Sequence, residues 1–288
     1  MTQKLGRNYR ITIDPADGKP LIVITLPFTI QFNLQRNTLA DLNRLNIDIF
    51  NLSEANRARI YQDRFNYNTN KTIIFEVGYQ NLYQVFQGRI FEASTARSGT
   101  ELITRIESRD GLYQVSQSQT FQTLQNPQTV GGIIRFLASQ FTNLGIGAIG
   151  SYPDPVNRPT VLSGCTWDLL RQYSNNTVYI DSGKIYALGE SETTSDPVYT
   201  INDSTGLLDT PRRDEGFLTV TTLLEAAINM AQLVNLESSV QPLYNGQYKV
   251  VSVNHVGIIS GAVNGDCRSI FGLLHPDPFG AFKKVPNG

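Results

Sequence analysis

The stretch LNIDIFNL, residues 45–52, alternates apolar and polar side chains along its length. The stretch FTIQFN, residues 28–33, shows the same alternation upstream. Successive side chains of a β-strand point to opposite faces, so this pattern is typical of strands with one buried and one solvated face. We therefore expect a chain built mainly of β-strands.

Further strands and one helix flank these two stretches in the first part of the chain. Short runs of β-branched and aromatic residues, bounded by turn residues, predict strands. These are residues 9–13, 21–26, 72–79, 82–90 and 101–107, the last followed by the turn signal Asp110-Gly111. A helix is expected at 52–63, where Asn51 precedes Glu54 by three residues as in a capping box. Strands with one inserted helix predict a small barrel.

The middle of the chain has a different pattern. Apolar residues between Val130 and Leu144 recur at helical spacing, with Thr129 as candidate N-cap and Gly145 as the C-terminal stop. A second helix is expected at 163–173, because Trp167, Leu170 and Tyr173 would share one face. Residues 177–188 resemble a β-hairpin. We expect a small α/β unit here.

The last third is β-rich again. Strands are expected at 198–201, 217–224, 232–237, 247–254 and 268–274. The fold class is thus mainly β (α+β), with two similar β-barrels and a small α/β insert between them. The expected divisions are a first barrel at 1–125, a middle domain at 126–195, a second barrel at 196–275 and an extended C-terminal arm at 276–288.

The two β-rich regions suggest an internal repeat. Residues 40–49 and 229–238 both place a polar turn before an alternating strand, and residues 88–93 pair in pattern with 247–253. Few residues are identical between them. Two interpretations stay open from the residues alone: a true duplication, or a chance similarity between β-rich segments.

Composition and charge argue against nucleic-acid binding, disulfide-rich and membrane-spanning classes of protein. Of 288 residues, 24 are Lys or Arg and 25 are Asp or Glu, so the net charge of −1 offers no global field for nucleic acid. The two cysteines, Cys165 and Cys267, lie far apart and resemble neither a disulfide framework nor a metal motif. The N-terminus lacks signal-peptide features, and the apolar run 21–30 is too short and interrupted to span a bilayer. We expect a protein made in the cytoplasm with no membrane partner and no specific nucleic-acid recognition.

No catalytic, cofactor-binding or metal-binding residues emerge from the sequence, and the binding residues stay unassigned. His255 follows an alternating strand and is expected to be packed or hydrogen-bonded, while His275 is expected in a loop. Walker, Rossmann, zincin and nucleophile-elbow motifs are absent from the sequence, and Gly131-Gly132 is expected to serve close helix packing. Cofactors are therefore not expected.

Carboxylates could by themselves provide an active site, because glycoside hydrolysis needs only two of them. Glu190 and Glu192 lie in a polar segment where solvated side chains are expected, and Asp168 is expected to be exposed or capping on a helix. The others of interest are in turn or helix-end contexts: Asp63, Asp110 and Asp214. None has the apolar setting that would raise its pKa. The sequence therefore favours a protein that is not an enzyme.

Three groups of segments carry a resemblance to a known family. The first comprises residues 45–53, 77–79, 85–90, 104–106 and 110–111; the second comprises 206–211, 236–238, 245–250 and 255–257; the third comprises 165–170 and 180–185. In these segments, which together extend over most of the chain, it resembles the central baseplate hub of contractile-tailed phages.

The resemblance implies a structural virion protein in the tail baseplate. In that family two barrels related to the tail-tube fold lie in one subunit, and three subunits form a ring of six barrels. A homotrimer, the tail tube protein and the central spike protein are the implied partners, with the tape-measure protein and wedge or other baseplate proteins as further candidates. Lumen-facing strand faces are expected to be polar, so that DNA can pass.

Two alternatives compete with the hub. One is another tail component of related fold, a distal tail or tube-initiator protein, which predicts a hexamer or one barrel per chain. The other is a glycan-binding or glycan-cleaving β-protein, which requires an aromatic platform or paired carboxylates on one concave face.

Overall fold

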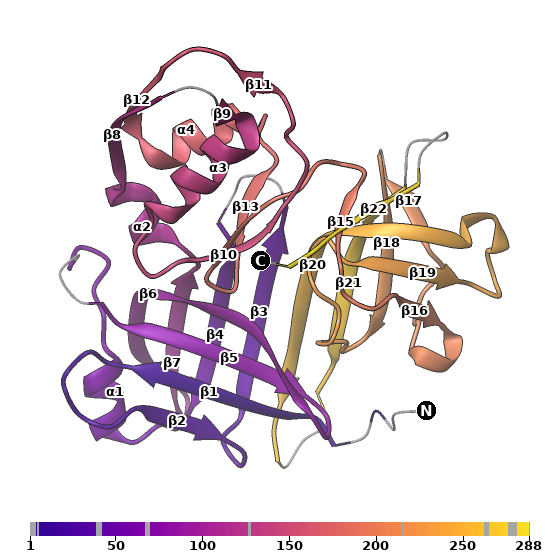
Figure 1. Cartoon of the computed structure of the whole chain (residues 1–288). Helices are drawn as coiled ribbons and strands as arrows, with labels where there is room; N and C mark the ends of the chain where they lie inside the picture. The colour runs from indigo at the N-terminus through magenta and orange to yellow at the C-terminus, as the bar shows by residue number, and fades with distance from the viewer. Residues whose placement is uncertain are drawn as a thin grey trace.

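The fold is described from a computed structural model, shown in Figure 1. The structure describes residues 4, 6–38, 42–66, 70–125, 128–214, 216–261, 265–275 and 281–287. Its helices are α1 Glu54–Ile60, α2 Leu112–Gln117, α3 Val130–Ser139 and α4 Thr166–Tyr173, with 3₁₀ turns at Asp203–Thr205 and Pro242–Tyr244. Strands dominate the rest, so the mainly β prediction is confirmed.

The strands of the first part are β1 Asn8–Asp14, β2 Ile22–Thr25, β3 Ile30–Asn37, β4 Arg44–Phe50, β5 Thr72–Gly78, β6 Leu82–Ser98 and β7 Glu101–Arg109. Those of the middle are β8 Gln119–Leu124, β9 Gln128–Thr129, β10 Gly145–Ile149, β11 Pro155–Val156, β12 Thr160–Cys165, β13 Val178–Asp181, β14 Lys184–Ala187 and β15 Glu192–Thr194. Those of the last part are β16 Tyr199–Asn202, β17 Arg212–Asp214, β18 Phe217–Leu223, β19 Leu233–Glu237, β20 Gly246–Ile259, β21 Cys267–Leu274 and β22 Lys283–Val285.

One large sheet of thirteen strands joins the first and last parts of the chain. Its main order is β17-β18-β21-β20-β3-β4-β7-β6-β5-β1-β2; off this path β19 pairs with β20, and β16 pairs with β19. The two parts meet where β3 pairs antiparallel with β20 over eight residues, from Ser252 opposite Asn37 to Ile259 opposite Ile30. Figure 1 shows these two strands side by side in the middle of the molecule. The sheet is antiparallel except at β16 and β19.

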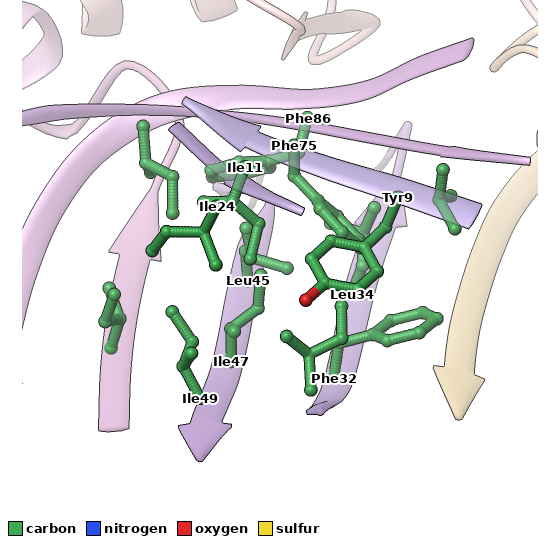
Figure 2. Close-up of a cluster of buried hydrophobic side chains, with 14 of the residues drawn as sticks. Tyr9, Ile11, Ile24, Phe32, Leu34, Leu45, Ile47, Ile49, Phe75 and Phe86 are labelled. Atoms are coloured by element: carbon green, nitrogen blue, oxygen red, sulfur yellow. The ribbon is translucent and has the colours of Figure 1, made fainter. Parts of the chain in front are cut away.

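The first part of the sheet curls over its own apolar face. Figure 1 shows β1 and β5 crossing in front of β3, β4 and β7. Figure 2 shows Tyr9, Ile11 and Phe75 approaching Phe32 and Ile47 in the space between the two layers. All five side chains are at most 1% exposed, and they form the main core together with the other inward-facing residues of these strands. Burial of a side chain this large contributes about 1.5–3 kcal/mol.

Two further cores lie outside this one. The second core belongs to the last part of the chain and includes Val220, Val234, Val250 and Phe271. The third lies under α3 and α4 of the middle part, where Phe141 packs edge-on against Trp167 with ring centroids 6.4 Å apart. Each part of the chain therefore has its own apolar interior, although one sheet passes through two of them.

The strand order of the first part is repeated in the last part, although β1 pairs antiparallel with β5 whereas β16 pairs in parallel with β19. The first follows the order β3-β4-β7-β6-β5-β1, and the last follows β17-β18-β21-β20-β19-β16. The registers also match: Thr72 lies opposite Arg89 on β5 and β6, as Leu233 lies opposite Lys249 on β19 and β20. In both parts the long strand carries a bulge against the strand that follows it, after Ile90 and after Val250. The duplication is therefore real at the level of strand order.

The structural equivalence differs from the one expected from sequence. The register makes β4 equivalent to β18, so the expected match of residues 40–49 with 229–238 is wrong. The match of residues 88–93 with 247–253 is one residue out of register, because Arg89 corresponds to Lys249. Two closed barrels remain a prediction; what is observed is two repeats within one sheet.

Several predicted boundaries need correction. The N-cap of α1 is Ser53, whose Oγ accepts from the Asn56 amide, whereas Asn51 adopts a left-handed φ of 59° before the helix. Thr129 caps α3 as predicted, but α3 ends at Ser139, and Gly145 begins β10 instead of terminating the helix. Asp110-Gly111 leads into α2, and the predicted hairpin at 177–188 is confirmed as β13 and β14.

The division into four segments also stays a prediction. Since β8 pairs with β12, and Val115 and Leu124 pack against the third core, we propose that the middle segment starts at Gly111. Within the expected arm, residues 276–280 and 288 lie outside the described part of the chain. β22 lies in the arm and pairs in parallel with β15 of the middle segment.

Candidate functional site

The large sheet carries a polar face opposite the main core. On β3, Phe32, Leu34 and Arg36 are buried, while Gln31, Asn33, Gln35 and Asn37 point to the other side and are exposed or half-buried. β4 alternates in the same way, with Arg44, Asn46 and Asp48 on the polar side. Because Asn33 lies directly opposite Asn46, the two strands present one continuous surface.

The polar face continues across neighbouring strands of both repeats. Arg105 and Glu107 extend it on β7, where they lie opposite Asp48 and Asn46. On the other side of β3, Asn254 lies opposite Gln35 and Ser252 opposite Asn37. Thr219 and Thr221 on β18 continue the same alternation. The surface therefore consists largely of amides, hydroxyls and charges, with Val256, Ile258 and Ile270 among its apolar members.

Most charges on this face are paired. Arg105 donates from Nε and Nη2 to the two Asp48 carboxylate oxygens, each at 2.9 Å. Arg44 donates to Glu107 at 2.6 and 3.1 Å. Desolvation opposes ionisation of Glu107, but hydrogen bonds from Arg44 and Arg109 lower its pKa overall. Pairing of opposite charges leaves the face with little net field toward a polyanion.

A buried polar cluster fixes the middle segment to the end of β3. The Arg36 guanidinium, 3% exposed, donates to both oxygens of Asp181 at 2.9 and 2.6 Å. Asn43 donates to Asp181 and to the Ile180 carbonyl, each at 2.9 Å. Asp110 accepts from the Gly183 amide at 3.2 Å. The cluster therefore joins the β3–β4 connection to the β13–β14 turn.

Asp110 corrects a sequence-based expectation. Its side chain is 1% exposed, and desolvation together with the nearby Asp181 charge raises its pKa to about 8. The expectation that no carboxylate has a pKa-raising setting is therefore wrong for Asp110. The long-range contact with residues 180–183 creates that setting, and the local sequence around Asp110-Gly111 gives no sign of it.

Of the two carboxylates that were expected to be solvated, Glu190 and Glu192, only Glu190 is exposed. Glu190 is exposed, but Glu192 is only 8% exposed and accepts from the amides of Gly189 and Ser151 at 3.0 and 2.8 Å. The expectation of a solvated Glu192 is therefore wrong. Its carboxylate satisfies two backbone donors, a structural role, and it faces Lys249, whose burial lowers its pKa to about 8.

The remaining candidates have structural environments. His255 is fully buried and its Nδ1 lies 2.7 Å from Ser269 Oγ, as expected for a packed, hydrogen-bonded histidine. His275 contacts the Tyr248 ring edge-on. Asp168 is exposed on α4, and Asp63 accepts from the Phe65 amide at a turn. The side chain of Asp214 lies outside the described part of the structure.

The described residues form neither a disulfide nor a metal site. Cys165 and Cys267 are both free. Among the described residues, no group of three or more His, Cys, Asp and Glu side chains could hold a metal ion. The described helices include none that is long and apolar enough to cross a membrane. The polar sheet face, to which strands of both repeats contribute, is the candidate functional site.

Comparison with known families decides between the candidate classes. The family model described as Baseplate hub gp41 matches residues 9–256, which includes both repeats up to β20. The chain belongs to this baseplate hub family. A baseplate hub is a structural component of a phage tail, so the hub resemblance and the expectation of a non-enzymatic virion protein are confirmed.

Solved structures share the fold at low sequence identity. A tail protein from Neisseria meningitidis MC58 matches with a TM-score of 0.62 and 11% identity, covering 94% of this chain and 97% of its own. The 43 kDa tail protein of prophage MuSo2 from Shewanella oneidensis gives 0.59 and 10%, covering 93% and 97%. The c3393 protein of E. coli, a type VI secretion component, gives 0.54 and 9%, covering 88% and 75%. No curated protein matches the baseplate hub chain in sequence.

Proposed function

We propose that this baseplate hub is a homotrimer that joins the hexameric tail tube to the trimeric central spike and lines the DNA channel. The observation that carries the proposal is the repeated strand order, β3-β4-β7-β6-β5-β1 and β17-β18-β21-β20-β19-β16, within one chain. A ring of three chains would then contain six related units. Such a ring could present six similar docking surfaces to a hexamer while keeping the threefold symmetry of a spike.

The junction of the repeats supports a ring. β3 and β20 pair over eight residues, so the repeats are held side by side by main-chain hydrogen bonds and not by a flexible linker. A rigid junction fixes the angle between the two units. Three chains with a fixed internal angle of the required size close into a ring, whereas a variable angle would give mixed assemblies.

The polar face supports its assignment to the channel. Transit of DNA requires a surface that neither adsorbs phosphates nor repels them strongly. The amides of Gln31, Asn33 and Asn46 carry no charge, and the Asp48–Arg105 pair offsets its own charges. The opposite face is apolar and already buried in the cores, so it is unavailable to the channel.

The tube and the spike would contact the two rims of the ring. The tape-measure protein and wedge or other baseplate proteins are further candidate partners, and assembly would follow synthesis in the host cytoplasm. The glycan-directed alternative is less well supported, because Glu192 is used by backbone donors and the neighbouring carboxylates Asp110 and Asp181 are buried in the cluster with Arg36.

Electron microscopy of the purified hub tests this proposal. We expect particle averages with a central opening, threefold symmetry and six similar lobes. An average with six identical subunits would instead support a distal tail or tube-initiator protein. Compact particles without a central opening, even at high protein concentration, would contradict the proposed DNA channel.

A further inference from the structure

Among the described strands, the edge of β6 is unpaired over a segment where the equivalent edge of β20 is paired with another strand. In the last part, β20 pairs with β21 on one side and, on the other, first with β19 and then with β3 of the first part. In the first part, β6 pairs with β7 on one side and with β5 on the other. Gln62 bridges to Ala93 beyond β5. No described strand continues this side of β6 past Ala93.

The exposed segment of β6 differs in burial from the equivalent segment of β20. Residues 94–98 are all exposed on both faces of the strand. In the equivalent part of β20, residues 254–258, His255 and Gly257 are buried, and Asn254 and Val256 are half-buried. The Gln62–Ala93 bridge uses the Ala93 N–H and C=O on the side away from β7. Thr95, two residues later, therefore presents its backbone groups on the same unpaired side.

A second unpaired edge is found at β17. This strand is the counterpart of β3, since Arg213 lies opposite Leu218 as Leu34 lies opposite Leu45. β3 is paired on both sides, whereas β17 ends the sheet and, among the described strands, pairs only with β18. Arg212 and Arg213 are exposed there. Unpaired edges of this kind are templates for pairing with another chain.

We propose that β6 of one hub subunit pairs antiparallel with β17 of the next, and that this edge is the subunit interface of the trimer. The inference rests on the proposed trimer and names its contact. The β20–β3 junction within the chain is the template, because it joins the same two strand types between successive repeats. The interface is head-to-tail, so three copies close it into a ring.

The template also fixes the register. His255 lies opposite Leu34 and Val256 opposite Asn33 in the chain. Transfer to the equivalent residues places Thr95 opposite Arg213, and Ala96 opposite Arg212, of the neighbouring copy. Gln62 closes the β6 edge on one side of this segment, and Pro211, which has no N–H, limits β17 on the other. The interface strands are therefore short, at about three residue pairs.

Charge favours the same arrangement. Glu101 is exposed at the β6–β7 turn and lies opposite Ser98, on the same face as Ala96. Arg212 of the neighbouring copy would join this face beside Ala96. The opposite signs favour the pairing, and the exposed position makes the attraction sensitive to salt. Trimer formation should therefore weaken as ionic strength rises.

Engineered disulfides test the register directly. Ala96→Cys combined with Arg212→Cys, in a Cys165→Ser background, places the two thiols in a non-hydrogen-bonded pair whose Cα separation of about 4.5 Å permits a disulfide. Cys267 can stay, because it is 1% exposed and burial raises its thiol pKa to about 12. We expect covalent dimers and closed trimers on a non-reducing gel, and no larger species.

Two matched controls accompany this variant. Arg97→Cys with Arg212→Cys shifts the register by one residue, which turns the side chains to opposite faces, and should not cross-link. Asn33→Cys with Val256→Cys is the equivalent pair inside the chain and should form an intramolecular disulfide. If Arg97→Cys with Arg212→Cys forms a disulfide as efficiently as Ala96→Cys with Arg212→Cys, the proposed register is wrong.

Proline substitution separates the interface from the fold. Thr95→Pro removes an N–H that faces the neighbouring copy, whereas Ala96→Pro removes one that faces β7 within the chain. We expect Thr95→Pro to weaken trimer association about tenfold or more per interface with little change in melting temperature. Ala96→Pro should lower the melting temperature. If the Thr95→Pro protein stays trimeric and the Ala96→Cys with Arg212→Cys variant forms no disulfide, this interface is wrong but the trimer is not contradicted. If the wild-type protein is a monomer at every concentration, both the interface and the trimer are wrong.

Discussion

The Arg36–Asp181 ion pair offers the sharpest test of how the middle segment is held to the sheet. Arg36 is 3% exposed and Asp181 is 6% exposed, and two hydrogen bonds join them at 2.9 and 2.6 Å. Asp181→Asn keeps the shape of the side chain but leaves a buried guanidinium without its counter-ion. Loss of one partner of such a pair costs about 3–5 kcal/mol.

The nearby Asp110 determines how much stability Asp181→Asn should lose within this range of free energies. Its carboxyl group lies close enough to Arg36 for its charge to act on the guanidinium, and ionisation of Asp110 can replace part of the lost charge. We therefore expect a loss of about 3 kcal/mol in the free energy of unfolding. For a chain of this size the melting temperature should fall by roughly 5 °C.

Urea unfolding followed by fluorescence measures this loss. The single tryptophan, Trp167, lies in the third core and reports on the middle segment. Arg105→Gln is the matched control, because its ion pair with Asp48 is exposed and should contribute less than about 1 kcal/mol. The double variant Arg36→Met with Asp181→Leu should recover most of the stability. A loss below about 1 kcal/mol for Asp181→Asn would refute the reasoning.

Four further results are expected. Because the pKa of Asp110 is raised to about 8, the stabilising contribution of its protonated carboxyl group is complete below about pH 4 and is lost as pH rises to 8. The wild-type protein should therefore lose about 5 kcal/mol in the free energy of unfolding over this range, and Asp110→Asn should abolish that loss in denaturant titrations at different pH. Burial lowers the pKa of His255 to about 3, so its contribution is present above about pH 6.5 and is lost as pH falls toward 3; His255→Gln should flatten acid unfolding monitored by circular dichroism. Phe32→Ala should reduce the free energy of unfolding by about 3–5 kcal/mol in urea, since Phe32 is 1% exposed and packs 5.2 Å from Phe75. Lysines at Gln31, Asn33 and Gln35 should create salt-dependent binding of duplex DNA in an anisotropy assay, whereas the wild-type polar face should show little, and a variant without added affinity would argue against a DNA-facing surface.

The alternation in the sequence predicted the parts of the sheet whose two faces differ. Strands β3 and β4 follow from residues 28–33 and 45–52, because each has an apolar face in the main core and a polar face outside it. Their faces could not be assigned to core or channel from sequence, since that assignment depends on which strands pair beside them. The pairing of β3 with β20 joins residues more than two hundred positions apart.

Features set by distant contacts were missed. The far end of β6, residues 94–98, has exposed side chains on both faces and no apolar alternation; its pairing with β7 makes it a strand. Helix α2 was missed because Asp110-Gly111 resembles a hairpin turn, although Gly111, with φ 69°, is the N-cap of a helix. Glu192 looked solvated because its two amide partners include Ser151, which is remote in sequence.

The mass of the purified hub across a wide concentration range tests the central claim most directly. Light scattering should give three times the 32.0 kDa subunit mass at high concentration, with dissociation on dilution. A hexamer would contradict the two-repeat ring and favour a tube-like component. A monomer at every concentration would contradict the trimeric hub itself.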